Sequence, residues 1–146
     1  MQLKSVMKRS VVVVTPDTLL QEAARKMSVH NVSVLPVCEG RRIVGLLTAR
    51  DLTTRATAQG CDPRTCQVRE VMMFPAIWGR ESQNVNEAAD LMQRWQISRL
   101  PVLNRRKHLV GIVSLYDLQG PSLRDIHHPK SASHHSRWMS FRLIKA

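Results

Sequence analysis

Apolar residues along this chain follow a strand-like period and then a helix-like period, starting with a short run of β-branched side chains. Val11–Val14 has the composition of a buried strand, and the proline-containing stretch Thr15–Asp17 ends it. Thr18 can cap the helix that follows, with Gln21 three positions later as its capping-box partner. One apolar face of this helix is made by Leu19, Leu20, Ala23, Ala24 and Met27.

The stretch after Asn31, which ends the helix, has the pattern of a β-hairpin. Residues 33–38 and 43–47 are apolar enough for buried strands, and the polar turn between them contains a glycine. Thr48 can cap a second helix, which we expect to extend to about Ala58. The predicted order of this half is therefore β-α-β-β-α.

The second half of the chain repeats this order. Its predicted elements are a weaker first strand at 75–78, a helix at 85–95, hairpin strands at 99–103 and 109–113, and a last helix that Ser114 begins and Gly120-Pro121 ends early. Residues 59–68, with a glycine and a proline, link the two halves.

The sequence itself repeats as well. Val6-Met7 returns as Val71-Met72, Glu22-Ala23-Ala24 as Glu87-Ala88-Ala89, and Ser33-x-Leu35-Pro36-Val37 as Ser98-x-Leu100-Pro101-Val102, always 65 positions later. Asp51-Leu52 returns 66 positions later as Asp117-Leu118. The extra residue falls in the polar hairpin turn, where an insertion costs little. Two units of about 60 residues are each marginal alone, so we expect them to share one core.

Composition narrows the class of protein. The 146 residues suit one compact domain, and no apolar run is long enough for a membrane span. Residues 1–4 lack the apolar stretch of a secretory signal. The three cysteines are odd in number and lack metal-binding spacing, so we expect free thiols in a reducing cytoplasm and no structural zinc site.

The net charge of +11 favours anionic partners. Residues 1–118 carry 17 basic and 10 acidic side chains, and residues 119–146 carry 5 and 1. Because both parts are basic, the charge is not confined to a tail. Nucleotides, nucleic acid and acidic protein surfaces are the partners that this composition favours.

A Gly-x-x-[Thr/Ser]-x-x-Asp motif follows the last strand of each half, as Gly45-x-x-Thr48-x-x-Asp51 and as residues 111–117. The hydroxyl lies at a predicted helix start, where free backbone N–H groups favour anions such as phosphate. The aspartate lies one turn later on the same side, where a carboxylate can accept both hydroxyls of a ribose. The glycine lets backbone or ligand approach closely, so the motif suits a nucleoside phosphate.

The same spacing is also that of an ordinary helix capping box, and one copy alone indicates no site. Two copies, each in a half that carries Ser-x-Leu-Pro-Val, indicate a pair of related sites. The two aspartates belong to separate motifs, and no Ser-His-Asp, Cys-His or paired-carboxylate pattern is persuasive. We therefore do not expect an enzyme.

With both motifs in both halves, residues 5–119 resemble a tandem pair of CBS domains, the unit named after cystathionine β-synthase and called a Bateman module when paired. The resemblance implies an α/β fold of the α+β type, with two β-α-β-β-α units packed sheet to sheet in pseudo-two-fold symmetry. We expect unit 1 at 1–62, unit 2 at 63–120 and a basic, His-rich tail at 121–146. The implied ligand is an adenosine nucleotide (AMP, ADP or ATP) or NAD or S-adenosylmethionine, with or without magnesium.

The resemblance also implies roles for particular residues. The family aspartate binds ribose, the Thr or Ser binds ribose or phosphate, and the base lies between the residues before Leu-Pro-Val and the first-strand region of the partner unit. The expected binding residues are Thr48, Asp51, Ser33, Met73 and Ile77 for one cleft, and Ser114, Asp117, Ser98, Arg99, Arg9, Val12 and Val32 for the other, together with Gly45, Gly111 and Ile97.

The two expected clefts differ in charge. Arg99 follows Ser98, whereas Val34 follows Ser33, and a guanidinium can neutralise a phosphate. Lys8 and Arg9 add positive charge near the Asp117 cleft. We therefore expect the Asp117 cleft to bind phosphate more tightly.

The implied function is regulatory. Nucleotide binding would rigidify or re-angle the two units, two modules would pair as a homodimer, and a protein partner would respond in trans, because no enzyme, channel or transporter domain is evident. No catalytic cofactor and no membrane association are expected. Two alternatives stay open, a nucleic-acid-binding protein that uses the basic surface and tail, and a structural dimerisation module with vestigial clefts.

Three weaker signals have ordinary explanations. His127, His128, His134 and His135 suit metal binding, but a solvated tail is the default. Arg105–His108 is a basic hairpin tip, typical of a solvated turn and less often of a nucleic-acid contact. Cys38 lies on a predicted strand and is expected in the core.

Overall fold

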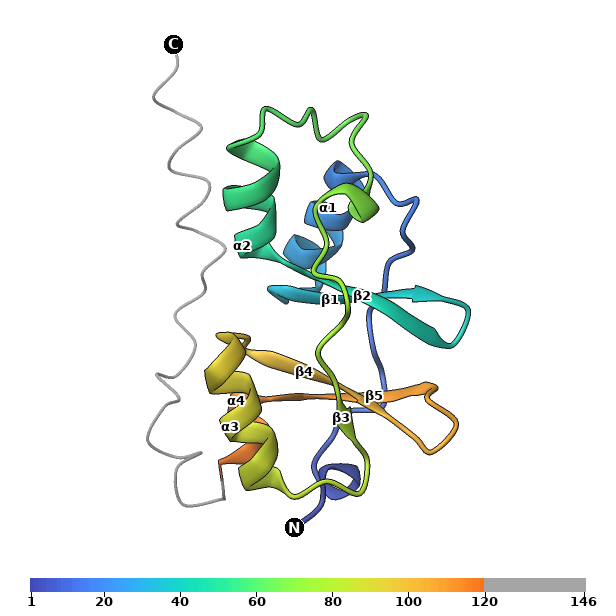
Figure 1. Cartoon of the computed structure of the whole chain (residues 1–146), viewed down its shortest axis with the longest axis vertical. Coiled ribbons are helices and arrows are strands. Elements are labelled where there is room, and N and C mark those ends of the chain that lie inside the picture. The colour runs from blue at the N-terminus through green and yellow to red at the C-terminus, as the bar shows by residue number, and fades with distance from the viewer. Residues whose placement is uncertain (120–146) are drawn as a thin grey trace.

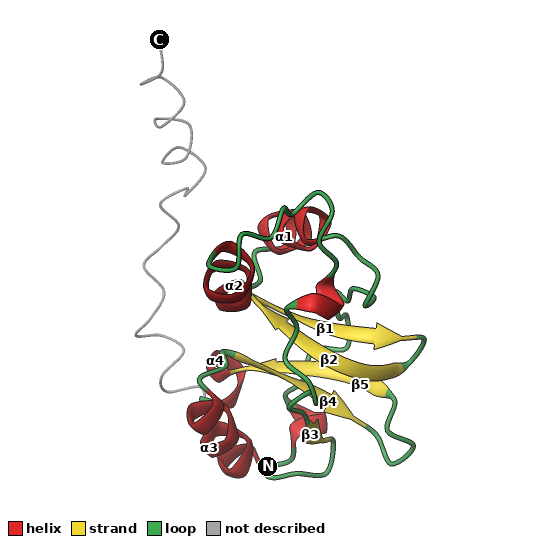
Figure 2. Ribbon diagram, turned by 45° about the horizontal axis from the view of Figure 1, so that its top comes forward, coloured by secondary structure: helices red, strands yellow, loops and turns green. Residues whose placement is uncertain are grey.

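Two antiparallel β-hairpins stack face to face and form the centre of the molecule. A computed structural model describes residues 1–119. The first hairpin pairs β1 (Val34–Glu39) with β2 (Arg42–Thr48), and the second pairs β4 (Arg99–Leu103) with β5 (Leu109–Ser114). Each hairpin has helices on its outer side, so the layers run helix, sheet, sheet, helix (Figures 1 and 2). The predicted α+β fold with two similar units is confirmed.

Helices complete each unit. The first unit has α1 (Leu20–His30) and α2 (Ala49–Asp51), and α2 continues as a wider π-helical segment, η2 (Leu52–Thr57). The second unit has α3 (Val85–Trp95) and α4 (Leu115–Leu118), preceded by the short strand β3 (Gly79–Arg80). Three-residue 3₁₀ turns, η1 (Leu3–Ser5) and η3 (Val68–Glu70), lie ahead of the units in the sequence.

The segment ahead of each unit crosses to the other unit. Lys8 exchanges backbone hydrogen bonds of 2.9 Å with Ile112 in β5, and Met73 exchanges bonds of 2.8 and 3.1 Å with Leu46 in β2. Leu3 N–H donates to the Gln83 carbonyl at 2.9 Å. The two crossings occupy equivalent positions of the repeat, so the pseudo-symmetry includes the exchanged segments.

The hydrophobic cores are built crosswise for the same reason. The first core joins residues of α1, β1 and β2 to Cys66, Val68 and Val71, which follow the linker. The second joins α3, β4 and β5 to Leu3 and Met7. The boundary between the two units, expected between residues 62 and 63, stays a prediction from the sequence repeat. Each hydrophobic core contains residues from both sides of that boundary.

Both first strands are shorter than the sequence predicts. In the run Val11–Val14 only Val14 pairs with β1, and in the second unit the pairing begins at Gly79 rather than at 75–78. The reason lies in the Leu-Pro-Val motif. Val14 N–H donates to the Pro36 carbonyl, but Pro36 has no N–H to donate to the carbonyl of Val12, so the ladder cannot extend.

The start of α1 also differs from the prediction. Thr18 does not cap it with Gln21. The Thr18 Oγ1 accepts a hydrogen bond from Thr15 N–H at 3.0 Å and closes a turn instead. The first N–H groups of α1 donate to backbone carbonyls, Leu20 to Cys66 and Gln21 to Pro63. The helix buries Leu20, Ala23 and Met27, while Leu19 and Ala24 are exposed.

Two of the three cysteines are paired, which corrects the expectation of free thiols. A turn brings Cys66 N–H to the Asp62 carbonyl at 2.8 Å and places the Cα atoms of Cys61 and Cys66 5.9 Å apart, joined by a disulfide. Cys38 is free and buried in β1, as expected, and burial raises the pKa of its thiol from 9.0 to about 11.

Thiol titration tests this assignment. At pH 8 the folded protein is expected to react very slowly with a thiol reagent, because the raised pKa of Cys38 leaves almost no thiolate and the side chain is buried. Denaturation without reductant should expose one thiol per chain, and reduction should raise the count to three. Three reactive thiols before reduction would contradict the disulfide.

Within residues 1–119 no helix is long and apolar enough to cross a membrane. The residues 120–146, which include the predicted histidine cluster, lie outside the described part of the chain.

Candidate functional site

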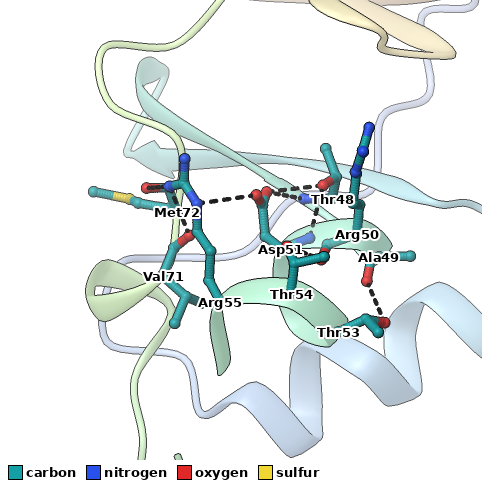
Figure 3. A network of polar contacts seen from close by, with 9 residues as sticks. All are labelled: Thr48, Ala49, Arg50, Asp51, Thr53, Thr54, Arg55, Val71 and Met72. Atoms are coloured by element: carbon teal, nitrogen blue, oxygen red, sulfur yellow. Dashed lines mark hydrogen bonds and ion pairs between the residues drawn. The ribbon is translucent and has the colours of Figure 1, made fainter. Parts of the chain in front are cut away.

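A capping box at the start of α2 fixes the Asp51 carboxylate. Thr48 donates to Asp51 Oδ2 from its N–H at 2.8 Å and from its hydroxyl at 2.9 Å, and Asp51 N–H donates back to Thr48 Oγ1 at 3.1 Å (Figure 3). Asp51 is only 6% exposed. Its second oxygen, Oδ1, lies outside the box, 3.6 Å from Nε of Arg55.

The second unit repeats this arrangement at α4. Ser114 donates to Asp117 Oδ2 from its N–H at 2.8 Å and from its hydroxyl at 2.7 Å. Asp117 Oδ1 lies 4.0 Å from the Lys8 ammonium, which the crossing N-terminal segment supplies. The capping-box and binding-site interpretations of the motif are compatible, because in both units the cap uses Oδ2 and the Oδ1 atom lies beside a cationic side chain.

The backbone N–H groups at the two helix starts are less available than the sequence suggests. Ala49 N–H donates to the Ser33 carbonyl at 2.8 Å, and Leu115 N–H donates to the Ser98 carbonyl at 3.2 Å. The aspartate N–H groups are taken by the capping hydroxyls. The expectation of free N–H groups beside the hydroxyl is wrong for these positions, so a phosphate would rely on cationic side chains.

Ser33 and Ser98 lie on the pseudo-two-fold axis. Their hydroxyl oxygens are 3.1 Å apart, although the residues are equivalent positions of different units. Because each serine carbonyl also holds the start of the neighbouring helix, this contact ties both capping boxes to the axis. The two candidate clefts therefore share a common wall.

The first cleft has a volume of about 360 Å³ and lies between the two units. Most of the predicted set lines it, including Ser33, Thr48, Asp51 and Met73. The remaining lining residues are Val34, Ala49, Arg50, Thr54, Arg55, Trp95, Gln96, Ile97 and Ser98. Ile77 does not line the cleft and packs against the second core instead.

The sequence did not indicate several residues of this cleft, among them Arg50, Arg55, Trp95 and Gln96. Arg50 Nη1 donates to Gln96 Oε1 at 2.8 Å and links α2 to the end of α3. Arg55 also approaches the carbonyls of residues 71 and 72, and Trp95 lines the cleft with 48% of its surface exposed. The Asp-x-x-x-Arg spacing, which places Arg55 one helical turn from Asp51, was a usable signal for Arg55.

The second cleft consists of two adjoining hollows of about 220 and 440 Å³. Val32 and Arg99 line both of them, so the long Arg99 side chain lies where the first cleft has the short Val34. The smaller hollow also contains Lys8 and Val12, and the larger contains Ser33, Ser98 and Ser114. Arg9 is exposed and lines neither hollow. Asp117 does not line them either, and its Oδ1 lies 4.0 Å from Lys8, which lines the smaller one.

The motif glycines face the crossing segments. A Cβ on Gly45 would lie 2.5 Å from Met72 Sδ and 3.1 Å from the Met73 carbonyl oxygen. A Cβ on Gly111 would lie 2.5 Å from Met7 Sδ and 3.0 Å from the Lys8 carbonyl oxygen. Of the two roles left open by the sequence, close backbone approach is the one that the packing supports.

Other chemistry is scarce in the described part of the molecule. Within residues 1–119 no group of three or more His, Cys, Asp or Glu side chains is arranged to hold a metal ion. Burial raises the pKa of the Cys38 thiol to about 11, which keeps it protonated and makes it a poor nucleophile.

Comparison with known proteins agrees with this geometry. A family model described as the CBS domain matches residues 3–57 and again residues 68–120. The CBS domain-containing protein YhcV of Bacillus subtilis is 43% identical over 115 residues, which cover 79% of this chain and 81% of that protein. Inosine-5'-monophosphate dehydrogenase of Methanocaldococcus jannaschii is 30% identical over 75% of this chain, but the match covers only 21% of the enzyme.

Solved structures extend the comparison to ligands. The CBS domain pair of protein MJ0100, in complex with 5′-methylthioadenosine and S-adenosyl-L-methionine, superposes with a TM-score of 0.70. The two chains are 27% identical, and the superposition covers 81% of this chain and 92% of that one.

Proposed function

Because this chain belongs to the CBS-domain family and carries two CBS domains, we propose that it is a regulatory module that binds an adenosine nucleotide between them. The proposal rests on one observation above all. Each unit fixes a carboxylate through a capping box and leaves its Oδ1 beside a cationic side chain, Arg55 at Asp51 and Lys8 at Asp117.

This pairing matches the two polar ends of a nucleotide. A carboxylate oxygen can accept hydrogen bonds from ribose hydroxyls, and a guanidinium or ammonium can neutralise phosphate. Apolar walls suited to a base come from Trp95 and Ile97 in the first cleft and from Val12 and Val32 in the second. The adenosyl ligands bound to the related MJ0100 pair support adenosine as the nucleoside.

The Asp117 cleft is the proposed tighter phosphate site. In the first cleft, Arg50 is held by Gln96 and Arg55 by Asp51. Arg99 makes no ion pair with any residue from 1 to 119, so phosphate binding would break no existing contact. Lys8 adds a second cation at the same cleft, where it would be shared between the phosphate and Asp117 Oδ1, 4.0 Å away. Magnesium is expected to be needed only where a triphosphate brings more charge than these two cations balance.

The proposed signal is a change in how the two units sit against each other. Both clefts have walls from both units, so a ligand ties β2 and α2 to α3, or β5 and α4 to the first unit. A ligand that favours one arrangement shifts the population toward it. A homodimer and a protein partner that distinguishes the two arrangements complete the proposal.

Thermal unfolding with a ligand panel tests this function. Nucleotide-free protein would be scanned with AMP, ADP, ATP, NAD and S-adenosylmethionine, with and without magnesium. A ligand at 100 times its dissociation constant should raise the unfolding free energy by about 2.7 kcal/mol. Isothermal titration would then give the number of occupied clefts. The absence of any shift across the panel would contradict the proposal and favour a structural dimerisation module.

A further inference from the structure

The tips of the two hairpins lie side by side at the edge of the molecule away from α2 and α4 (Figures 1 and 2). A bridge pairs Arg42 of the first tip with His108 of the second, and Leu109 N–H donates to the Arg41 carbonyl at 2.9 Å. The basic tip seen in the sequence is therefore one half of a larger feature that only the fold brings together.

This edge concentrates positive charge. Its exposed cations, which we call the basic rim, are Arg41, Arg42, Arg80, Arg105, Arg106 and Lys107. Within residues 1–119 none of the six forms an ion pair, whereas Arg55, Arg64 and Arg69 elsewhere each have an acidic partner. Two carboxylates lie at the same edge, Glu39 opposite Arg42 in the hairpin register and Glu81 in the turn after β3, so six cations against two acids leave an excess of four positive charges. Such an excess creates a positive potential that attracts a polyanion.

A hollow of about 270 Å³ opens beside the rim. Three cations, Arg80, Arg105 and Lys107, and one carboxylate, Glu81, line it beside the half-buried Trp78. The other lining residues are Ser82, Asn104 and the buried Leu103. An aromatic ring next to cations is the combination with which proteins hold single strands, since bases stack on the ring while cations contact phosphates. An acidic peptide would use the cations but has no base to place on Trp78.

We propose that the basic rim binds single-stranded nucleic acid, with the rim cations on phosphates and Trp78 as a stacking platform. This surface is separate from the nucleotide clefts. β2 begins at the rim with Arg42 and ends at the first cleft with Thr48, so about 20 Å of strand lies between them. Substitutions at one site should therefore leave the other intact.

Fluorescence anisotropy of the full chain with labelled 20-nucleotide RNA and DNA single strands tests the proposal across a salt series. The rim variant Arg41→Gln/Arg105→Gln is compared with Arg25→Gln/Arg94→Gln, which removes two exposed cations from α1 and α3 and has the same net charge. The rim variant should bind at least tenfold more weakly. Its slope of log K against log salt should fall by about 1.4, from roughly 0.7 per lost phosphate contact.

Substitutions of Trp78 distinguish binding of nucleic acid from binding of other polyanions. Trp78→Ala should weaken oligonucleotide binding several-fold with an unchanged salt slope, and Trp78→Phe should restore it, since a ring of either kind can stack. Thermal unfolding of both variants confirms folding. Equal losses in the rim variant and its charge-matched control would overturn the proposal. Competition by polyglutamate as effective as that by an unlabelled oligonucleotide would also overturn it, in favour of an acidic protein partner.

Discussion

Leu3→Ala is expected to lower the free energy of unfolding by about 2–5 kcal/mol, the usual range for emptying a buried leucine site. Leu3 is fully buried, although it lies in a three-residue turn near the start of the chain. The cavity opens in the second core, where Leu3 packs with residues of α3, β4 and β5. The weakened region is therefore expected to be the second unit, far from Leu3 in sequence.

Amide hydrogen exchange locates the damage. Leu3→Ala should accelerate exchange in β4 and β5 more than in β1 and β2. Val68→Ala is the matched control, because Val68 occupies the equivalent turn η3 and packs into the first core. It should produce the opposite pattern, with a smaller loss of stability because fewer atoms are removed. Faster exchange confined to residues 20–48 in Leu3→Ala would contradict the crossed packing.

Asp51→Ala and Asp117→Ala are each expected to weaken adenosine nucleotide binding at one cleft by about 2–4 kcal/mol, or roughly 30- to 900-fold. Each change removes the carboxylate oxygen proposed to accept ribose hydroxyls. Titration calorimetry should show one binding step weakened and the other preserved. Asp117→Ala should weaken the tighter of the two binding steps, because Lys8 and Arg99 lie at the second cleft.

Two controls separate binding from folding. Alanine at position 51 also removes the cap on α2, so Asp51→Asn is needed, which keeps an acceptor for Thr48 while removing the charge. Asp90→Ala removes an exposed acid from α3 and should leave both binding steps unchanged. If both cleft variants bind with the affinity of the unmodified protein, the proposed ribose role of the aspartates is wrong.

Elements with local signals could be predicted from the sequence. The helix at 85–95 and the hairpin strands agree with the structure within one or two residues, because helical periodicity and turn chemistry are encoded by near neighbours. The capping boxes at Thr48 and Ser114 were likewise visible as three-residue spacings. The first strands were overestimated, because their length depends on an N–H that Pro36 lacks in a distant strand.

Contacts between distant parts of the chain could not be predicted in the same way. The repeat of Val6-Met7 as Val71-Met72 showed that these apolar residues matter, but their partners lie in the other unit. In the site, the aspartates and Ser33 were found from the motif, while Trp95 and Gln96 enter the first cleft only because α3 ends there. Ile77 and Arg9 were expected beside a ligand on the strength of resemblance, and packing places them elsewhere.

The crossed segments also determine the order in which the molecule can be completed during synthesis. Lys8 is translated about a hundred residues before its partner Ile112. The neighbouring core residues Leu3 and Met7 therefore stay uncovered until β5 has left the ribosome. The first unit needs only the chain as far as Met73. The nascent protein is thus expected to assemble from the middle outward, with Leu3 and Met7 docking last and exposed to chaperones until then.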